Sequence, residues 1–548
     1  METIASKHIR IYDQLKSDRA ALEAYWQDLT YYCLPRKAYI TKIKSVGDRL
    51  PADVYDSTAI MSNAYFAAGM QAYMSSPQAK WFTIGLRNSN LLKYQHIKEY
   101  LRDCEDEIYS IINNSNFYQE DVESYLSLGS IGTDVLYSEE DTKEIVRFDS
   151  MPIESVVICA NDQNRVDTAY IEYELTPQQA AGKFGEDNLS PEVKKKLIEG
   201  DYVSKFKYLL CIAPRGVYDS SKKDAKNMPF MALWIDKKEK AVVRESGFKE
   251  FPIFVSRFAK AKGDPYGYSP AMNIFADIKM TNQIAKTNII AAQNVARPPL
   301  EIPDEAFLRP YNFNPGGVNI KNSGYPNEHI VPIVTGANVP MTLEYIRDHR
   351  ERIAQAFYND LFIMNQQIGK MTAFEVDVRN NQRMQLLGSA VGNVMRGKLS
   401  PVIERIYALA AKNGRLPKLP PELIDEEYII IYISPLARAQ KALEMNNINQ
   451  AMSIIGQYIQ VNPEVMDKID FDELVNQIRD ITELSPKIIR DDAEVDALRE
   501  NRAQSNQMAQ QLAAIQQGTE TVKIASESDR NLADANNKGA PLAAGEKV

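Results

Sequence analysis

The chain has 548 residues, 44% of them hydrophobic and 25% charged, which is the balance of a globular protein and excludes a wholly disordered chain. Its 64 Lys and Arg residues against 73 Asp and Glu residues give a net charge of −9, so the chain is poorly suited to hold nucleic acid by broad neutralisation of phosphates. At about 150 residues per domain, the length suggests three or four domains.

The cysteines and histidines limit the chemistry further. The four cysteines form no C-x-x-C pair, which favours a reducing compartment and argues against a disulfide framework or a zinc site. The four histidines form no H-E-x-x-H motif. The first residues lack the apolar core of a signal peptide, and no apolar run approaches 18 residues. We therefore expect a soluble, intracellular, multi-domain protein without a metal, a cofactor or a membrane span.

Helical patterns dominate the first 130 residues. Residues 3–34 repeat apolar side chains at intervals of three, four and seven residues, which predicts an amphipathic helix. A second helix is predicted over about 56–76, with Asp56 near its start as a cap, and a third helical stretch over 91–128.

The pattern changes to strands between about 133 and 260. Short β-branched or aromatic segments such as TDVLYS, ESVVICA and FMALWI alternate with turn residues, and a helical insertion interrupts them at 176–185. This block predicts an α+β domain with an antiparallel sheet.

A long helix is predicted next over 269–297, with Ser269 as its N-cap. Proline and glycine are frequent over 298–340, and short strand candidates lie between them, which indicates a compact β-rich module rather than a flexible linker. Helix resumes over 341–362. A long helix with polar residues around much of its circumference usually has neighbours on several sides, including other subunits.

Further helices are predicted toward the carboxyl end. One spans 372–412, where Thr372 and Glu375 match a capping box. The strand EYIIIYIS then leads into helices over about 436–500. The last residues, 501–548, are rich in Gln, Ala and Asn, and we expect a loosely packed helix followed by a disordered tail.

One segment nearly matches a phosphate-binding loop. Residues Gly392–Lys398 fit G-x-x-x-x-G-K, but Leu399 stands where Ser or Thr would bind magnesium. The segment also lies inside a helical run instead of following a strand, and no Walker B strand accompanies it. A chance match is the better interpretation.

Other catalytic signatures are missing as well. The sequence has no G-x-S-x-G elbow and no G-x-G-x-x-G loop. The acidic cluster at Asp491, Asp492, Glu494 and Asp496 is more typical of a solvated face than of a cation site. An enzyme is therefore the minority hypothesis.

Several short motifs occur in a consistent order along residues 8–440. The more specific ones are Tyr266-Gly267-Tyr268-Ser269-Pro270 with Asp277-Ile278-Lys279, then Met371-Thr372-Ala373-Phe374-Glu375-Val376, then Ser434-Pro435-Leu436-Ala437. Weaker ones are Trp26 with Tyr32-Cys33-Leu34-Pro35, Asp56-Ser57-Thr58-Ala59, Gly129-Ser130-Ile131-Gly132-Thr133 and Leu175-Thr176-Pro177-Gln178-Gln179. Together they resemble the head-to-tail connecting, or portal, proteins of short-tailed tailed bacteriophages, which usually have a basic or small residue where Tyr268 stands.

The resemblance implies an α+β, mainly helical portal-protein fold with a wing, a two-helix stem, a β-rich clip and a helical crown. The implied divisions are 1–265 as wing, 266–297 as first stem helix, 298–340 as clip, 341–362 as second stem helix, 363–371 as tunnel loop, 372–440 as long wing helix and return strand, 441–500 as crown and 501–548 as a flexible Gln/Ala-rich tail.

The resemblance also implies residues that meet the DNA channel or its partners. In the stem these are Asp277, Lys279, Asn282 and Lys286, and in the clip they are Asn312, Asn314, Gly316, Gly317, Lys321 and Tyr325. In the tunnel loop they are Asn365, Gln366, Gln367, Gly369 and Lys370. Amides and a single lysine suit weak contacts to phosphate, and Gly369 permits a bend.

The implied partners follow from the role of such proteins. Copies of the chain would form a ring, commonly twelve-fold, at one capsid vertex of the virion after assembly in the host cytoplasm. Double-stranded DNA would pass through it, and a mainly acidic wall would keep the duplex from sticking. The terminase large subunit would supply the force, in agreement with the missing Walker motifs. Major capsid and scaffolding proteins and a tail adaptor would contact its outside, with no membrane involved.

Two alternatives stay open at this point. One is a different intracellular scaffold or interaction protein, which would form no ring particles. The other is a nucleic-acid enzyme, which would show NTPase or nuclease activity.

Overall fold

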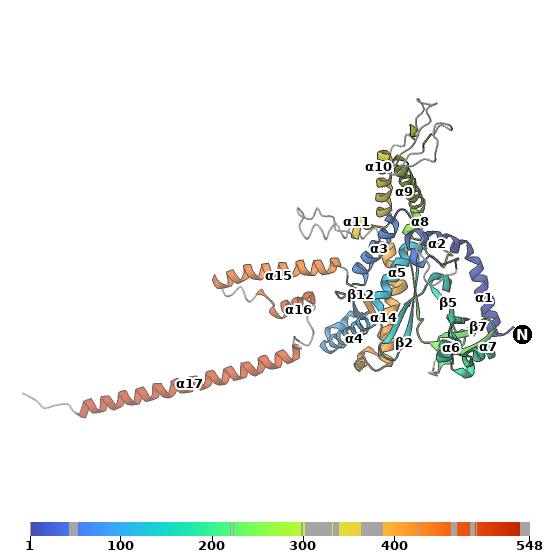
Figure 1. The fold of residues 1–548 in the computed structure, drawn as a ribbon. Coiled ribbons are helices and arrows are strands. Elements are labelled where there is room, and N and C mark those ends of the chain that lie inside the picture. Colours follow the sequence, from blue (N-terminus) through green and yellow to red (C-terminus); the bar gives the residue numbers. More distant parts are fainter. Residues whose placement is uncertain are drawn as a thin grey trace, which may run out of the picture. The chain divides into compact units, whose positions relative to one another are not determined.

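The computed structural model describes residues 2–42, 53–219, 221–222, 224–296, 300–301, 331–332, 339–362, 387–424, 426–433, 435–461, 468–482, 488, 490 and 492–537. The chain divides into two units, the first with residues 1–87 and 103–450 and the second with residues 88–102 and 451–548. Helices and antiparallel sheets are combined, so the predicted α+β class is confirmed (Figure 1).

The amino-terminal part of the chain is helical, as predicted, but its helices are shorter than the patterns suggest. The elements are α1 (Ile4–Asp18), α2 (Ala20–Cys33), α3 (Thr58–Met74), α4 (Gln95–Asn114) and α5 (Phe117–Ile131). The predicted helix 3–34 breaks at Arg19, whose buried guanidinium lies 3.0 Å from the Tyr266 hydroxyl and pairs with Glu23 at 2.8 Å. These tertiary partners hold Arg19 and redirect the chain between α1 and α2.

The strand-rich region forms two antiparallel sheets, as the sequence predicts. A five-stranded sheet has the order β4 (Val156–Ala160), β5 (Val166–Leu175), β6 (Phe206–Pro214), β7 (Phe230–Asp236) and β8 (Ala241–Phe248). A three-stranded sheet has the order β3 (Ile145–Ser150), β2 (Thr133–Asp141) and β9 (Ile253–Arg257). The predicted helical insertion is α6 (Pro177–Phe184), and a second helix that was not predicted, α7 (Pro191–Ile198), follows it.

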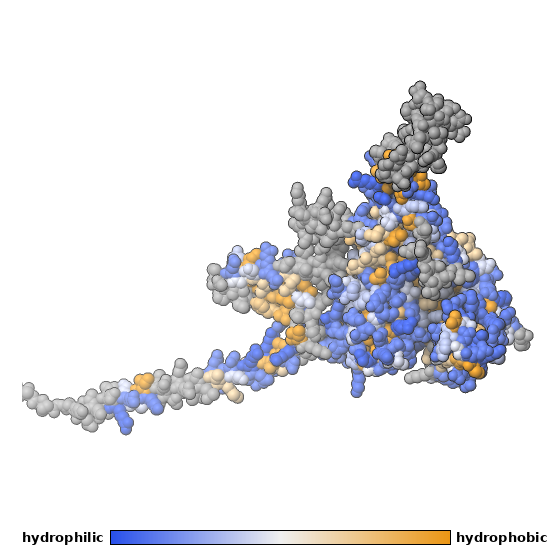
Figure 2. Space-filling model, in the orientation of Figure 1, coloured by the Kyte–Doolittle hydropathy of each residue, from blue (hydrophilic) through white to orange (hydrophobic). Residues whose placement is uncertain are grey.

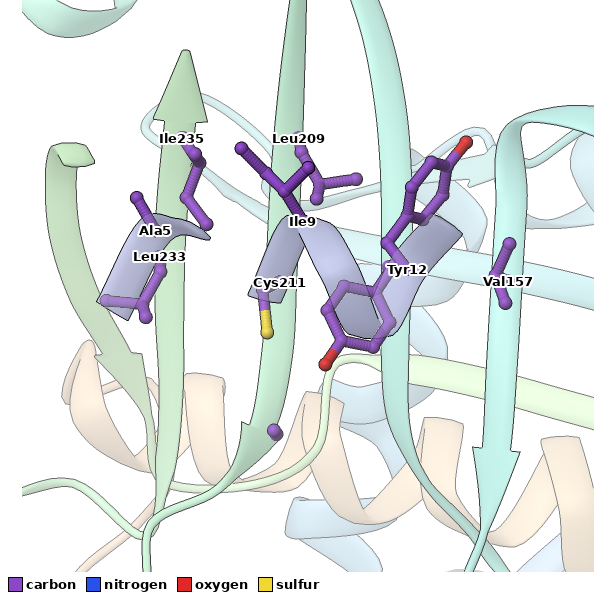
Figure 3. Packing of buried hydrophobic residues seen from close by; sticks show 10 residues of the cluster. Ala5, Ile9, Tyr12, Val157, Leu209, Cys211, Leu233 and Ile235 are labelled. Carbon is purple, nitrogen blue, oxygen red and sulfur yellow. The ribbon is translucent and has the colours of Figure 1, made fainter. Parts of the chain in front are cut away.

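Helix α1 packs on the five-stranded sheet and closes one core of the first unit. Its residues Ala5, Ile9 and Tyr12 point at the sheet residues shown with them in Figure 3. Each of these three side chains is at least nine-tenths buried. The spacing of four and three residues puts them on one helix face, which is why an amphipathic pattern is visible in the sequence.

The predicted helix 269–297 is interrupted after its first turn. It consists of α8 (Pro270–Asn273) and α9 (Phe275–Ala296), and Ile274 between them donates its N–H to the Ala271 carbonyl at 3.3 Å, a tightened turn that ends α8. Strands β10 (Leu300–Glu301) and β11 (Val331–Pro332) pair antiparallel, and α10 (Val339–Ala356) and α11 (Asn359–Phe362) follow.

The predicted helix 372–412 is described from residue 387 onward. It contains α13 (Gly388–Val394), a π-helical turn (Met395–Leu399) and α14 (Ser400–Lys412). The predicted strand is β12 (Tyr428–Tyr432), which pairs antiparallel with β1 (Phe82–Leu86) far earlier in the chain.

The carboxyl-terminal region is helical as predicted. Its elements are α15 (Pro435–Val461), α16 (Phe471–Thr482) and α17 (Asp492–Asn537). In the second unit, Arg499 near the start of α17 makes two contacts of 2.7 Å with the carboxylate of Asp472 in α16.

Candidate functional site

Helices α9 and α10 stand side by side as an antiparallel pair that projects from the first unit (Figure 1). The short antiparallel pair β10–β11 lies between α9 and α10 in chain order. The buried seam uses residues such as Ile278 and Ala285 of α9 with Ile346 and Ile353 of α10. The spacing of seven residues in each helix places these side chains on a single stripe.

One polar residue predicted for the first stem helix, Asn282, fastens α9 to the rest of the unit. The Asn282 Oδ1 atom accepts hydrogen bonds from the N–H groups of Tyr55 at 2.6 Å and Asp56 at 3.2 Å, and its amide donates to the Asp53 carbonyl at 3.0 Å. Asn282 is buried. Because its amide group satisfies three backbone groups, Asn282 fixes the path of the chain before α3.

The charged members of that set also have partners within the chain. The Lys279 Nζ atom lies 2.7 Å from the Asp28 carboxylate of α2, and the Lys286 Nζ atom lies 5.5 Å from the centre of the Tyr55 ring. The Asp277 Oδ1 atom lies 2.8 Å from Nδ1 of His349, across the seam between α9 and α10. The polar atoms of Asp277, Lys279 and Asn282 therefore make contacts inside the subunit.

Two residues that were not predicted from the sequence, His349 and Arg350, complete these contacts. His349 is buried in α10, and Arg350 pairs with Asp56 at 2.7 Å. The spacing of three residues from Ile346 and four from Ile353 puts His349 on the apolar face of the helix. A titratable residue on an apolar face is the signal that could have identified it.

The outward face of α9 is mostly uncharged. It includes the exposed residues Ala276, Met280, Gln283, Thr287 and Ile290, which recur at intervals of four, three, four and three. Met280 and Ile290 are 45% and 47% exposed. The charged residue beside them is the exposed Lys279, which pairs with Asp28. A helix side that is exposed but mostly uncharged is typical of a surface that packs on another protein.

The outward face of α10 is charged. Glu344, Asp348 and Glu351 recur at intervals of four and three, so their carboxylates form one exposed stripe. Arg347 and Arg352 flank it, and Arg347 lies 3.8 Å from Glu351. Charged and apolar side chains both reach the surface over this pair of helices (Figure 2).

The other predicted contact residues fall outside the described part of the chain. These are the clip residues Asn312, Asn314, Gly316, Gly317, Lys321 and Tyr325, and the tunnel-loop residues Asn365, Gln366, Gln367, Gly369 and Lys370.

The near-match to a phosphate-binding loop is part of the protein interior. Gly397 belongs to the π turn, and a Cβ atom there would lie 2.4 Å from the Val255 carbonyl oxygen of β9. The Lys398 Nζ atom is fully buried, 2.8 Å from Asp121 Oδ1 and 2.7 Å from Ser124 Oγ. It cannot reach a nucleotide, so interpreting the motif as a chance match is correct.

One cysteine lies beside a histidine, but the pair is not activated. The Cys211 Sγ atom is 3.4 Å from Nδ1 of His8, and that nitrogen is also 3.1 Å from the Tyr170 hydroxyl. Burial raises the pKa of Cys211 to about 12, and burial together with Lys7 lowers the pKa of His8. The thiol therefore stays protonated and is a poor nucleophile.

Within the described residues, no group of three or more His, Cys, Asp or Glu side chains is arranged to hold a metal ion. No helix there is both long and apolar enough to cross a membrane.

Comparison with known proteins relates most of the chain to one family. Residues 5–489 match the family described as "Bacteriophage head to tail connecting protein". The portal protein of Salmonella phage epsilon15 is 29% identical over 552 residues, which cover 98% of this chain and 99% of that protein. The probable portal protein of Bordetella phage BPP-1 is 29% identical over 514 residues, 93% of each chain.

Proposed function

The chain belongs to the bacteriophage head-to-tail connecting proteins, and from this premise we propose that it assembles as a ring, twelve-fold by analogy with the family, at one vertex of the capsid. The ring is the channel for genome packaging and ejection. It docks the terminase large subunit and later the tail adaptor, and major capsid and scaffolding proteins surround it. It is assembled in the host cytoplasm and stays in the virion as a structural part, not as an enzyme.

The unlike outer faces of α9 and α10 support this proposal most directly. In a ring each subunit has a neighbour on both sides and a channel in front, so a projecting helix pair must offer surfaces of different chemistry. The mostly uncharged face of α9, with Met280 and Ile290 exposed, suits contact with a neighbouring copy. The acidic stripe of α10 suits a wall past which DNA slides.

We assign residues 266–297 and 341–362 to the stem, which contains α9 and α10, and residues 298–340 to the clip. The wing comprises 1–265 and the long helix with return strand over 372–440, the tunnel loop 363–371, and the crown 441–500. Residues 501–548 form the tail, for which no role is assigned.

The acidic stripe has a simple electrostatic role in this assignment. A basic wall would gain affinity with each phosphate that it neutralises and would hold the DNA. Carboxylates at Glu344, Asp348 and Glu351 repel the duplex instead. Lys279, Asn282 and Lys286 hold the stem on the wing, and Asp277 joins α9 to α10.

The test is the oligomeric state of the purified full-length chain. We expect negative-stain images to show rings with a central hole, and light scattering at micromolar concentration to give a mass many times that of one chain. A monodisperse monomer across a range of salt and pH would contradict the proposal. Changing Met280→Asp and Ile290→Asp in the α9 face should prevent rings. The control Ile198→Asp with Val203→Asp, at apolar residues 87% and 85% exposed elsewhere in the first unit, should not.

A further inference from the structure

A loop between β9 and α8 gathers positive charge on a protein that is acidic overall. The loop, residues 258–268, carries the exposed Lys260 and Lys262, and Arg257 precedes it at the end of β9. Gly263 at the tip has a φ of 91°, and a Cβ there would meet nothing within 4 Å, so the tip is open to solvent.

A fourth cation reaches this loop from a distant part of the sequence. The π turn packs on β9 at Gly397, and the Asn393 amide donates to the Phe258 carbonyl at 3.2 Å. These contacts hold Arg396 on the exposed side of the turn, beside the loop, while Lys398 points into the core. The fold, not the sequence order, therefore brings Arg396 to Lys260.

No carboxylate in the described part of the chain lies within 4 Å of the charged nitrogens of these four cations. Asp264, the acidic residue of the loop, accepts a hydrogen bond of 2.6 Å from the Tyr268 hydroxyl. Arg257 is 3% exposed and donates to Asn164 and to the backbone of Asp264 and Pro265, and its buried Nε atom has no partner.

The positive charges of these residues repel one another, which makes it less favourable for each to be charged. Burial lowers the pKa of Lys260, and the charges of Arg257 and Arg396 lower it further. Burial also lowers the pKa of Arg257. Like charges held this close destabilise the folded chain unless an anion joins them.

We propose that Lys260, Lys262 and Arg396 contact the phosphates of double-stranded DNA, with Arg257 as a positioning residue that holds the loop. The proposal rests on the proposed function, in which DNA passes through the ring. The residue between the two lysines is Ala261, so the tip Lys260–Gly263 offers charge without the apolar core of a protein–protein interface. Mobile lysines on an open loop suit contacts that fix no sequence and release easily.

The experiment compares two full-length variants with equal changes of charge. One is K260A/K262A/R396A, and the control is K195A/K205A/K226A, whose lysines are exposed elsewhere in the first unit. Binding of a fluorescent 30-bp duplex to each protein is followed by anisotropy between 50 and 200 mM salt. Since each phosphate contact contributes about 0.9 to the slope of log affinity against log salt, we expect the first variant to lose about 2 to 3 from the slope and the control to lose none.

Each other outcome counts against the proposal. It fails if the wild-type protein binds no DNA, or if the first variant keeps the wild-type slope. It also fails if wild-type protein forms rings and K260A/K262A does not, because the loop would then be a subunit contact that meets an acidic surface of a second copy. A wild-type monomer that binds DNA through these residues would contradict the proposed ring and not this contact.

Discussion

At the scale of single residues, a buried charge network holds the centre of the first unit together. Lys398 lies 2.8 Å from Asp121 and 3.4 Å from Asp134, and its Nζ atom is 3.7 Å from the centre of the Tyr125 ring. Burial lowers the pKa of Lys398, but Asp121 and Asp134 outweigh this effect and raise it. Burial raises the pKa of Asp121 against the pull of the lysine. One cation thus joins α5, β2 and the π turn.

Replacing the lysine should leave the two carboxylates buried without a counter-charge. We expect Lys398→Met to lower the free energy of unfolding by about 3 to 5 kcal/mol, because removing the lysine leaves the carboxylates of Asp121 and Asp134 buried and unpaired. Guanidinium denaturation followed by tryptophan fluorescence measures the change. The triple change K398M/D121N/D134N should recover part of the loss, and an equal loss in both variants would contradict the role of charge.

A second residue makes stability depend on pH. Burial raises the pKa of Glu172, but hydrogen bonds and charge from Lys237, with Lys207, outweigh it and lower the pKa to about 2. A carboxylate whose pKa falls on folding adds stability above its unfolded pKa of about 4.5, and that stability is lost as pH falls toward 2. The shift corresponds to about 3 kcal/mol at neutral pH.

Glu172→Gln should therefore cost about 3 kcal/mol at pH 7 and progressively less between pH 4.5 and 2. Urea denaturation at several pH values measures the difference from wild type. Glu174→Gln is the matched control, because Glu174 is 47% exposed and its lysine neighbours lie 3.7 Å away. A cost for Glu172→Gln that did not change with pH would contradict the assigned charge pairing.

At the scale of elements, the inner sides of α9 and α10 hold the helix pair together and onto the first unit, and their outer sides are left for contacts outside the subunit. Their inner sides share a seam with the Asp277–His349 contact, and Asn282 and Lys279 bind α9 to the preceding elements. Their outer sides differ in charge. Anchoring a projecting pair at its base leaves both outer faces available for contacts outside the subunit.

Neutralising the α10 stripe tests its role directly. We expect E344Q/D348N/E351Q to assemble normally but to retain DNA more strongly at 50 mM salt, since fewer carboxylates repel the phosphates. Filter retention of a linear duplex by purified rings measures this, and the difference should shrink at 200 mM salt. The control E186Q/D187N/E239Q changes the same charge at exposed sites far along the sequence. If both variants retained the duplex equally, the proposal that the acidic stripe repels DNA would be contradicted.

At the scale of the whole molecule, the proposed ring needs the clip as a docking surface and the first unit as the part that holds the clip. The proposed clip, 298–340, is connected to the first unit through α9 and α10. Shortening it should therefore leave the first unit folded and remove only the surface for terminase and tail adaptor.

Deleting Asn312–Tyr325 should abolish packaging while the thermal unfolding of the first unit stays within a few degrees. In vitro packaging of DNA into proheads that carry the variant measures the effect. A variant with a Gly/Ser linker of the same length separates the loss of contacts from the loss of length. Normal packaging by the deletion variant would mean that the clip lies elsewhere.

The sequence by itself determined the local elements and the family. Apolar residues at intervals of three, four and seven predicted the first helix, because they mark one buried face. Short β-branched or aromatic segments between turn residues predicted the antiparallel strands. The order of the motifs around Ser269-Pro270 and Ser434-Pro435 identified the head-to-tail connecting proteins, which the comparisons confirm. The predicted clip and tunnel-loop residues stay predictions.

Tertiary structure alone decided which residues meet. Arg19 ends α1 because groups such as the distant Tyr266 hydroxyl bind its guanidinium. Gly397 and Lys398 belong to a segment that resembles a phosphate-binding loop, but they are part of the core because Gly397 packs on β9 and Lys398 pairs with Asp121. Arg396 reaches Lys260 in the same way. Periodicity records which face of an element is buried, but not what it is buried against, so charge partners far apart in the chain appear only in the folded protein.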